Sequence, residues 1–431
     1  MKVIRNLFIL SWIFLLVIFV GCGKDDTCEV KCGANQVLTS DCKCVTLGDD
    51  KNVIVSSNIT VNTTWTKDKI YHLAQRVTVT DGVTLTIEAG TVIKGQAGSG
   101  ANATALLIAR GAKLNAQGTA AAPIIFTSVA DEIVSGQIKS PNLEPTVSGL
   151  WGGLIILGRA PISAAADAVQ IEGIPPSDIN GLYGGSDAAD NSGIIKYVSI
   201  RHGGANIGEG NEINGLTLGG VGNSTIIENI EIIGNSDDGI ECFGGSVNLK
   251  NIIVWNSGDD AFDMDQAYSG TIDNIVAILG NDSDHAFELD GPEGAIKGSF
   301  TIKNGTVKGS LTTIMGEYGD LRDKVTCTLE NIYFYNFKED SDLELDNAGV
   351  SDNWIAGKII FKNLEFNVSH LAAGNITLDK IFKDDGGRDA ELNAAAIGFA
   401  KVVTTPGTGA FKSAFNGWTW SEANGELVAL R

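Results

Sequence analysis

Carboxylate side chains recur in pairs through the second half of this 431-residue sequence, and their type and spacing could support chemistry. Four acidic pairs precede short segments in which apolar and acidic residues alternate: Asp237-Asp238, Asp259-Asp260, Asp282 with Asp284, and Asp340 with Asp342. The segments themselves carry further carboxylates: Glu241, Asp263 with Asp265, Glu288 with Asp290, and Glu344 with Asp346. Carboxylates about 5 Å apart repel by about 1 kcal/mol or less in water. Three interpretations stay open: a solvated acidic face, a cation site, or catalytic carboxyls.

The cation interpretation favours Ca²⁺, which takes several oxygen ligands from Asp, Glu and backbone carbonyls. The candidate ligands are carboxylates expected to be neighbours on successive repeats: Asp238, Glu241, Asp260, Asp263 and Glu288. Calcium is the only cofactor that the sequence suggests.

The catalytic interpretation rests on carboxyl pairs of the kind that glycosidases use, about 5–5.5 Å apart in retaining enzymes and about 6.5–9.5 Å apart in inverting ones. A Ser-Gly-Asp-Asp stretch ending at Asp260 is similar to the paired-Asp motif of polygalacturonases, although the Gly-His-Gly motif of that pattern is missing. The nearest acid–base partner is a lone histidine, which is equally compatible with a structural role. The candidate catalytic residues are Asp259, Asp260, Asp284 and His285.

Three further residues are candidates for ligand binding. A lyase needs a cationic group near the substrate carboxylate, and Arg201 beside His202 is the best such pair, although it also reads as a polar strand end. Trp255 and Tyr268 flank the acidic segments and could be platforms for sugar rings, or Trp255 could be a packed exterior aromatic.

The elements that must position these residues are repeats of about 22 residues. Each repeat contains an alternating apolar segment around one Asn (Asn229, Asn251, Asn274 and Asn331) and a second segment with inward-facing Ile240, Phe262, Phe287 or Leu343. Fixed periods of 20–50 residues indicate solenoids, and no helical period separates the two segments. The pattern predicts a parallel β-helix in which coils stack about 4.8 Å apart, so that the acidic residues form a ladder on one outer face.

The same register predicts the roles of two residue types inside the repeat. The Asn residues should form an inward or corner ladder and bond the backbone of the next coil; Asn suits corners because it tolerates left-handed backbone conformations. Cys242 and Cys327 fall at inward positions several coils apart, farther than the about 7 Å between Cα atoms that a disulfide spans. We therefore expect two buried free thiols.

Composition excludes several classes of protein. Gly makes up about 12% of the chain (53 residues) and Pro about 2% (8 residues), which excludes collagen and Pro-rich disorder. The net charge is -21, from 52 acidic and 31 basic residues. Such a surface repels phosphate backbones, so nucleic acid is not an expected partner.

The N-terminus predicts export and anchoring. A basic start and an apolar run from Leu7 to Val20 are typical of a secretory signal, and Gly21-Cys22 resembles a lipoprotein cleavage site with Cys22 as the lipid-attachment residue. Residues 1–21 are then the signal peptide, and residues 22–48 a Cys-rich stalk with two disulfides. A Zn site is the rival interpretation of its four cysteines, Cys28, Cys32, Cys42 and Cys44. Residues 49–431 form the β-helix.

Several stretches resemble a known group of proteins. VTLTIEAGTVIKG, GLWGGLIILGRAPI, IIKYVSIRHGG and DDGIECFGG are similar to uncharacterised right-handed parallel β-helix surface lipoproteins of Bacteroidota, and the shape resembles pectate-lyase-like enzymes. Lys24-Asp25-Asp26 resembles the export tag of that group. The resemblance implies an all-β, right-handed β-helix with loop insertions, anchored by lipid in the outer membrane and facing outside.

Two functions follow as expectations. The first is a binding or structural module directed at polysaccharides, cell-surface glycans or other cell-surface partners, with Ca²⁺ on its acidic turns. The alternative is a polysaccharide lyase or glycoside hydrolase that uses the acidic site around Asp259 and Asp260. An enzyme would need these groups to converge, whereas a binding module needs only an exposed face.

Overall fold

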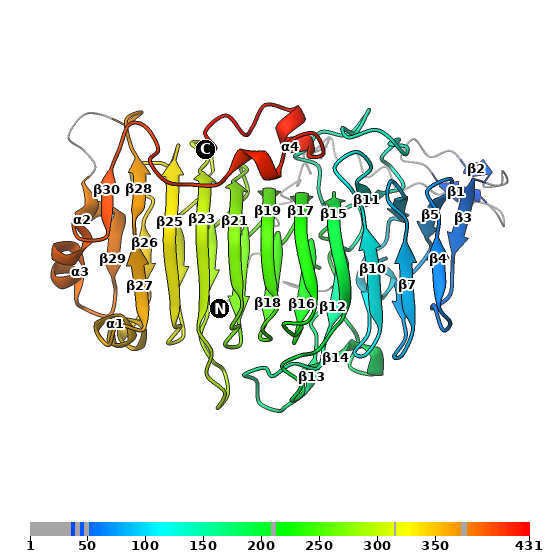
Figure 1. Ribbon diagram of the computed structural model, residues 1–431, viewed down its shortest axis with the longest axis horizontal. Helices are drawn as coiled ribbons and strands as arrows, with labels where there is room; N and C mark the ends of the chain where they lie inside the picture. Colours follow the sequence, from blue (N-terminus) through cyan, green and yellow to red (C-terminus); the bar gives the residue numbers. More distant parts are fainter. Residues whose placement is uncertain (1–35, 39–43, 47–50, 208–212, 314–315, 372–376) are drawn as a thin grey trace, which may run out of the picture.

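The chain folds into an elongated parallel β-helix (Figure 1). The structure is a computed structural model, and it describes residues 36–38, 44–46, 51–207, 213–313, 316–371 and 377–431. A 16-stranded and a 10-stranded parallel sheet form the body. The prediction of an all-β parallel solenoid is therefore confirmed.

Each central coil has three faces, because its longest strand bends once and belongs to two of them. These long strands are β15 (Gly193–Arg201), β17 (Ile226–Asn235), β19 (Asn248–Ser257), β21 (Thr271–Ile278), β23 (Phe300–Lys308) and β25 (Cys327–Tyr335). The first half of β15 pairs with β10 and its second half with β11. One strand therefore contributes to a first face and then to a second face.

The remaining strands extend these faces. The first face also contains β4 (Thr63–Trp65), β7 (Thr84–Ile87), β10 (Lys113–Gln117) and β27 (Ile359–Lys362). The second face adds β3 (Asn52–Val55), β5 (Ile70–Leu73), β8 (Val92–Gly95), β11 (Ile124–Ser128), β28 (Leu364–Asn367) and β30 (Ala400–Val402).

The third face is the separate 10-stranded sheet, which carries the acidic segments. Its strands are β6 (Val77–Val79), β9 (Leu106–Ile108), β12 (Leu154–Leu157), β16 (Leu216–Gly219), β18 (Ile240–Phe243), β20 (Phe262–Asp265), β22 (Phe287–Leu289), β24 (Gly319–Leu321), β26 (Leu343–Leu345) and β29 (Phe382–Asp384).

The core between the faces is filled by the inward residues that the repeat predicts. The third face contributes four fully buried residues to this core: Ile240, Phe262, Phe287 and Leu343. The first three lie in register on successive strands, and one further strand separates Phe287 from Leu343. Cys242 and Cys327 are buried free thiols, on β18 of the third face and β25 of the other sheet. The prediction for both cysteines is confirmed.

The bend between the first and second faces lies at a column of left-handed residues. Asn229, Asn251, Asn274 and Asn331 all have φ between 57° and 63°, and Asn304 and Asn363 continue the column. Their amides bond mainly to the side chain of the preceding coil's residue, as in Asn251 Nδ2 to Asn229 Oδ1 at 2.8 Å, and not to its backbone as predicted. The corner role is confirmed and the predicted partner was wrong.

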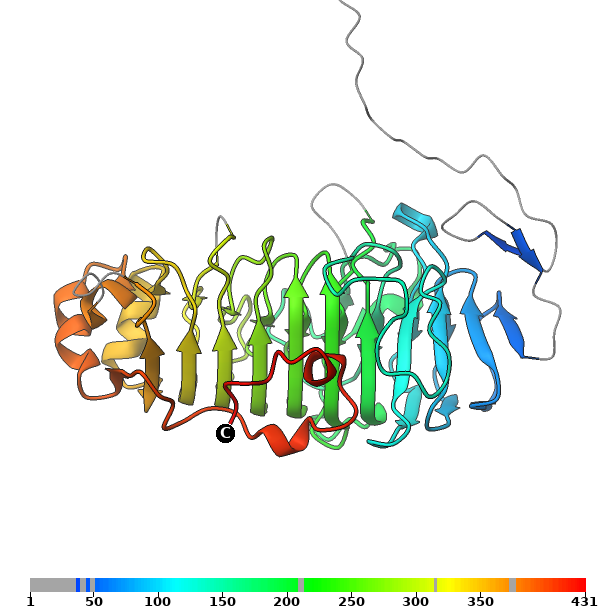
Figure 2. The same ribbon diagram turned by 90° about the horizontal axis from the view of Figure 1, so that it is seen from above.

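The C-terminal residues return over the outside of the second face (Figure 2). This strap, residues 404–431, contains η3 (Lys412–Ala414) and α4 (Trp420–Ala423). Phe415, Trp418 and Trp420 pack on the outward side chains of β17, β19 and β21. The strap therefore covers coils that precede it in sequence by more than 100 residues.

Small elements lie at the ends and in the insertions. The helices α1 (Ala348–Ile355), α2 (Leu378–Ile381) and α3 (Asp389–Ala396) cover the C-terminal end of the body. The insertions carry η1 (Gly100–Asn102), η2 (Ile179–Gly181) and an antiparallel pair, β13 (Val169–Gln170) with β14 (Leu182–Tyr183). Ahead of the body, β1 (Gln36–Leu38) pairs with β2 (Cys44–Thr46).

The predicted anchor and stalk lie almost entirely outside the described residues. This holds for Cys22 and for the disulfide candidates Cys28, Cys32 and Cys42, whereas Cys44 is described only as backbone in β2. Among the described residues, no helix is both long enough and apolar enough to cross a membrane.

Candidate functional site

The acidic ladder is formed by one residue from each of five successive strands of the third face. The register aligns Glu241, Asp263, Glu288, Asp320 and Glu344, and Lys383 follows on the last strand. Sequence reasoning missed Asp320, because it passed from the coil of Glu288 directly to that of Glu344. The apolar–acidic–apolar pattern around Asp320, Tyr318-Gly319-Asp320-Leu321, was the signal that could have found it.

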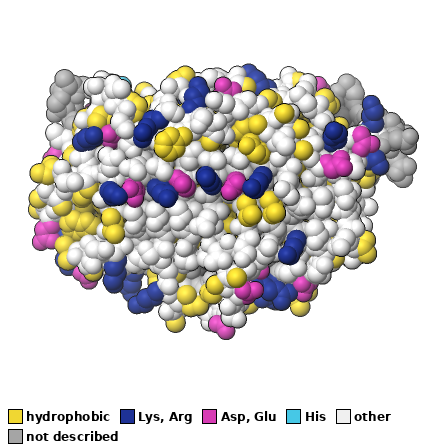
Figure 3. Space-filling model, viewed as in Figure 1, with side chains coloured by type: hydrophobic (Ala, Val, Ile, Leu, Met, Phe, Trp, Pro, Cys, Tyr) yellow, Lys and Arg dark blue, Asp and Glu magenta, His cyan; other side chains and the backbone are white. Residues whose placement is uncertain are grey.

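The first face also stacks charged residues at equivalent positions of successive coils, but in a different charge pattern. Its corresponding ladder alternates in sign along seven coils: Lys196, Glu228, Lys250, Asp273, Lys303, Glu330 and Lys362. Figure 3 shows this row of alternating basic and acidic side chains. Ion pairs such as Lys196 Nζ to Glu228 Oε2 at 3.0 Å lie within it. The fold therefore readily accepts alternating charge at stacked positions, whereas the third face carries carboxylates in succession.

Three of the predicted metal ligands meet in one buried cluster. Asp238, Glu241 and Asp263 each place a carboxylate oxygen within 4.8 Å of the others. Their exposed fractions are only 7%, 5% and 7%. Asn214 links two of them, since its amide nitrogen donates to Glu241 and its oxygen accepts the Asp238 backbone N–H at 3.2 Å.

Asp263 is the least satisfied member of this cluster. Its Oδ1 is buried and has no hydrogen-bond partner among the described residues. Asp263 also belongs to a second group with Asp265 and Asp290, whose oxygens lie within the same 4.8 Å limit. A buried carboxylate oxygen without a partner is costly, so this position favours a ligand that supplies positive charge.

Burial is the main electrostatic influence on this cluster. It raises the pKa of Asp238, Glu241 and Asp263 well above the ordinary range, and neighbouring carboxylates raise these pKa values further. The insertion that carries β14 contributes to the burial beside the ladder, where Tyr183 Oη donates to Gln266 Oε1 at 3.0 Å. Water is therefore largely kept from these carboxylates.

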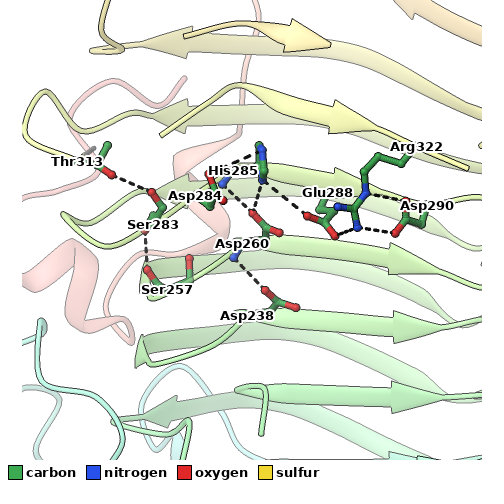
Figure 4. Close-up of polar contacts among 10 residues, drawn as sticks. All are labelled: Asp238, Ser257, Asp260, Ser283, Asp284, His285, Glu288, Asp290, Thr313 and Arg322. Carbon is green, nitrogen blue, oxygen red and sulfur yellow. Dashed lines mark hydrogen bonds and ion pairs between the residues drawn. The ribbon is translucent and has the colours of Figure 1, made fainter. Parts of the chain in front are cut away.

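A second group combines carboxyls with the predicted histidine (Figure 4). His285 Nδ1 lies 2.9 Å from Asp260 Oδ1 and 3.8 Å from Glu288 Oε2. The backbone N–H of His285 also donates to Asp260 Oδ1 at 2.7 Å. Asp284 is near as well, with 3.8 Å between its Oδ1 and His285 Nε2. The sequence-predicted Asp260, Asp284 and His285 are thus brought together.

The pKa values of His285 and Glu288 in this second group are raised. Burial lowers the pKa of His285, but the hydrogen bond and charge of Asp260, with help from Asp284, outweigh burial and raise it to about 9. Burial, together with Asp260, raises the pKa of Glu288 to about 9. The side chain of Asp259 is exposed and lies near the pair Asp237 and Asp238; partial desolvation by the surrounding chain, with the charges of Asp260 and Asp284, raises its pKa to about 6.

Arg322 is a site residue that sequence reasoning missed. It follows β24 and donates to Asp290 from Nε at 3.0 Å and from Nη2 at 2.8 Å, and Nη2 also contacts Glu288. The hydrogen bonds that Arg322 donates to Asp290 are the main cause that raises the pKa of Arg322. Arg322 thus neutralises part of the negative charge of Glu288 and Asp290, whereas Asp263 Oδ1 has no hydrogen-bond partner among the described residues.

The three predicted binding residues are not available to a ligand in solution, and those predictions were wrong. Tyr268 is fully buried and donates to the Val247 carbonyl at 2.6 Å. Trp255 is 6% exposed beneath Trp420 of the strap. Arg201 is fully buried beside the carboxylate of Glu231, at 3.7 Å.

The two parallel sheets, with residues stacked in register from coil to coil, define a parallel β-helix domain. The chain belongs to the pectate-lyase-like β-helix domain family, whose model matches residues 57–420. Comparison with curated proteins found no match. Comparison with solved structures also found none.

Proposed function

We propose that this protein is a lipid-anchored binding module of the bacterial outer surface, whose third face holds Ca²⁺ and engages glycans. The observation that carries the proposal is the buried Asp238–Glu241–Asp263 cluster with its unpartnered Asp263 oxygen. The alternating ladder of the first face strengthens it, because it shows that this chain can neutralise a stacked row with its own lysines.

The donor set of this cluster fits a hard cation. All three ligand groups are carboxylates, and neither histidine nor cysteine is among them. Ca²⁺ prefers such oxygen ligands, whereas Zn²⁺ prefers nitrogen and sulfur. Asp265 and Asp290 beyond Asp263 add more oxygens. A bound Ca²⁺ would neutralise two of these carboxylate charges and so weaken the repulsion of acidic glycans by this face.

The location rests on the N-terminal sequence. The apolar run before Cys22 and the following Lys-Asp-Asp support a lipid anchor and export to the outer membrane surface. An elongated β-helix held there presents its faces to external polymers, so polysaccharides or cell-surface glycans are the proposed partners.

Calcium titration of the full chain by calorimetry tests the cation site. Wild type is expected to bind Ca²⁺, and Asp263→Asn is expected to weaken binding at least tenfold, because it removes a central anionic ligand. Asp273→Asn makes the same chemical change in the alternating ladder and should leave the affinity unchanged. Absence of saturable binding, or equal loss in both variants, would reject the site. A glycan array with and without EDTA then tests glycan binding.

A hydrolase is the second candidate, and the protonated Glu288 favours it. A carboxyl with a pKa of about 9 is an acid at neutral pH, and Glu288 and Asp260 place oxygens within 4.8 Å of each other. Glycosidases use one protonated carboxyl as the general acid and one ionised carboxyl as the nucleophile or general base.

Product analysis on any polysaccharide that binds tests this candidate. If Glu288 is the general acid, Glu288→Gln is expected to lower kcat about 100-fold or more with little change in substrate binding. Asp352→Asn, a surface carboxylate on α1, serves as the control. If wild type releases no product from any polysaccharide that it binds, the hydrolase candidate is rejected and only the binding function stands.

A further inference from the structure

We infer that a lysine-lined pocket at the C-terminal end of the body binds a small molecule bearing a tetrahedral oxyanion ester, a phosphate or sulfate group on an organic body. The pocket has a volume of about 440 Å³ and lies between the loop 292–299, the start of β25, and α1 with β27. This volume suits a ligand of monosaccharide size. The inference does not depend on the cation site.

The lining of the pocket reverses the charge balance of the protein. Lys297, Lys324 and Lys358 line it, and none of the described lining residues is acidic. The chain as a whole has 52 acidic and 31 basic residues. Three lysine side chains at one concave site, without an acidic residue in the described lining, give the site a positive charge that favours an anion.

The walls of the pocket are held in place by hydrogen bonds. The Asn353 amide donates to the carbonyls of Lys324 at 2.7 Å and Val325 at 3.1 Å, and its oxygen accepts from Lys358 Nζ at 3.1 Å. Thr326 Oγ1 donates to the Gly298 carbonyl at 2.6 Å and so joins the floor to the opposite loop. The pocket is therefore pre-organised, which reduces the ordering cost of binding.

The residue types select the ligand chemistry. Lysine ammonium groups act as point charges suited to phosphate-like groups, whereas planar carboxylates are best matched by the fork of arginine, which is absent from the described lining. Hydroxyls of Ser299 and Thr328 add hydrogen-bonding groups, while Pro292 and Ile360 offer apolar contact to the body of the ligand.

Lys324 stands where glycine would be favoured. Its φ is 64°, and Asp323 before it has φ 45°, so two successive side-chain-bearing residues are left-handed. A non-glycine residue is disfavoured in this conformation. The lysine is thus placed at a conformational cost, and Lys324→Gly removes its charge without harming the local backbone.

The test is a titration of the full chain, in EDTA, with a matched set of glucose derivatives: the 6-phosphate, the 6-sulfate, glucuronate and glucose itself. Both esters are expected to bind at least tenfold more tightly than glucuronate or glucose. The comparison of the two esters then identifies the natural group. A phosphate ester carries more charge than a sulfate ester, so tighter binding of the 6-phosphate indicates a phosphate ligand. Tighter binding of the 6-sulfate, despite its lower charge, indicates a sulfate ligand. High salt should weaken binding, because it screens exposed charges.

Variants separate binding from folding. Lys324→Gly and Lys358→Gln are each expected to weaken ester binding about tenfold, with a thermal midpoint that is unchanged or higher for Lys324→Gly. Lys113→Gln, at an exposed position of β10, makes the same charge change elsewhere and should have no effect. The inference is overturned if neither ester binds, if glucuronate binds as tightly, or if Lys324→Gly retains full affinity. Because EDTA is present, such a failure leaves the calcium proposal standing.

Discussion

In EDTA, raising the pH from 5 to 8 is expected to lower the free energy of unfolding by at least about 3 kcal/mol, and Ca²⁺ at 100 times its Kd is expected to restore about 2.7 kcal/mol of this loss at pH 8. Burial raises the pKa of Glu288 to about 9 and of Asp320 to about 6. In the unfolded chain these carboxyls titrate near pH 4. The folded protein therefore holds more protons than the unfolded chain across this interval, and stability falls as pH rises.

His285 acts in the same direction over the upper part of the range. Its folded pKa of about 9 lies above the ordinary value of about 6.5, so its stabilising contribution is complete below pH 6.5 and is lost as pH approaches 9. Each pKa unit corresponds to about 1.4 kcal/mol. Ca²⁺ stabilises the folded state by about 2.7 kcal/mol at a concentration 100 times its Kd, and most strongly where the carboxylates are ionised.

Urea unfolding followed by tryptophan fluorescence, at each pH with EDTA or with CaCl₂, measures both effects. NaCl at matched ionic strength controls for screening. Stability that rises with pH in EDTA would contradict the raised carboxyl pKa values. Equal curves in CaCl₂ and NaCl would contradict a calcium site on the folded protein.

The second large effect is expected at the strap. Glu231→Gln should lower the free energy of unfolding by about 3–5 kcal/mol, because it removes the carboxylate charge that lies 3.7 Å from the buried Arg201. Glu231 Oε1 also accepts from the backbone N–H of Ser421 at 2.9 Å and from its hydroxyl at 2.8 Å, and so fixes α4. Arg201 in turn lies 5.0 Å from the ring centre of Trp420.

Glu228→Gln provides a matched control three residues earlier on β17. Glu228 pairs with Lys196 at the surface, where an ion pair is worth about 0–1 kcal/mol. Chemical denaturation of both variants measures the difference, and limited proteolysis reports whether the strap has detached. A similar, small effect of both substitutions would show that the strap does not depend on Glu231.

The repeat pattern predicted those parts of the structure that obey the repeat. Alternation along the strands placed Ile240 and Phe262 in the core and Glu241 and Asp263 on the opposite side of the sheet, where the structure shows that Glu241 and Asp263 are also buried. The alternating ladder could also have been read, since its residues immediately precede the corner residues, as Glu228 precedes Asn229. Asp320 was missed because insertions lengthen the repeat around it.

Contacts made by non-repeating segments could not be predicted in this way. Trp255 and Arg201 are covered by the strap, whose Trp420 is 165 and 219 positions farther along the chain and follows no period. The burial of the Asp238–Glu241–Asp263 cluster likewise depends on how the chain outside the strands packs on the third face. For that reason the repeat pattern located the acidic residues but left a solvated face, a cation site and catalytic carboxyls open.

The alternating ladder of the first face also bears on how the coils find their correct neighbours during folding. Repeats of similar sequence can stack in the wrong order, because any two strands of the first face offer compatible backbones. Along Lys196, Glu228, Lys250 and Asp273, adjacent coils carry opposite charges, whereas coils two apart carry like charges. A coil skipped during folding would therefore place like charges opposite each other, which is destabilising in a sheet. The alternating charges therefore favour stacking of the coils in the order of the sequence.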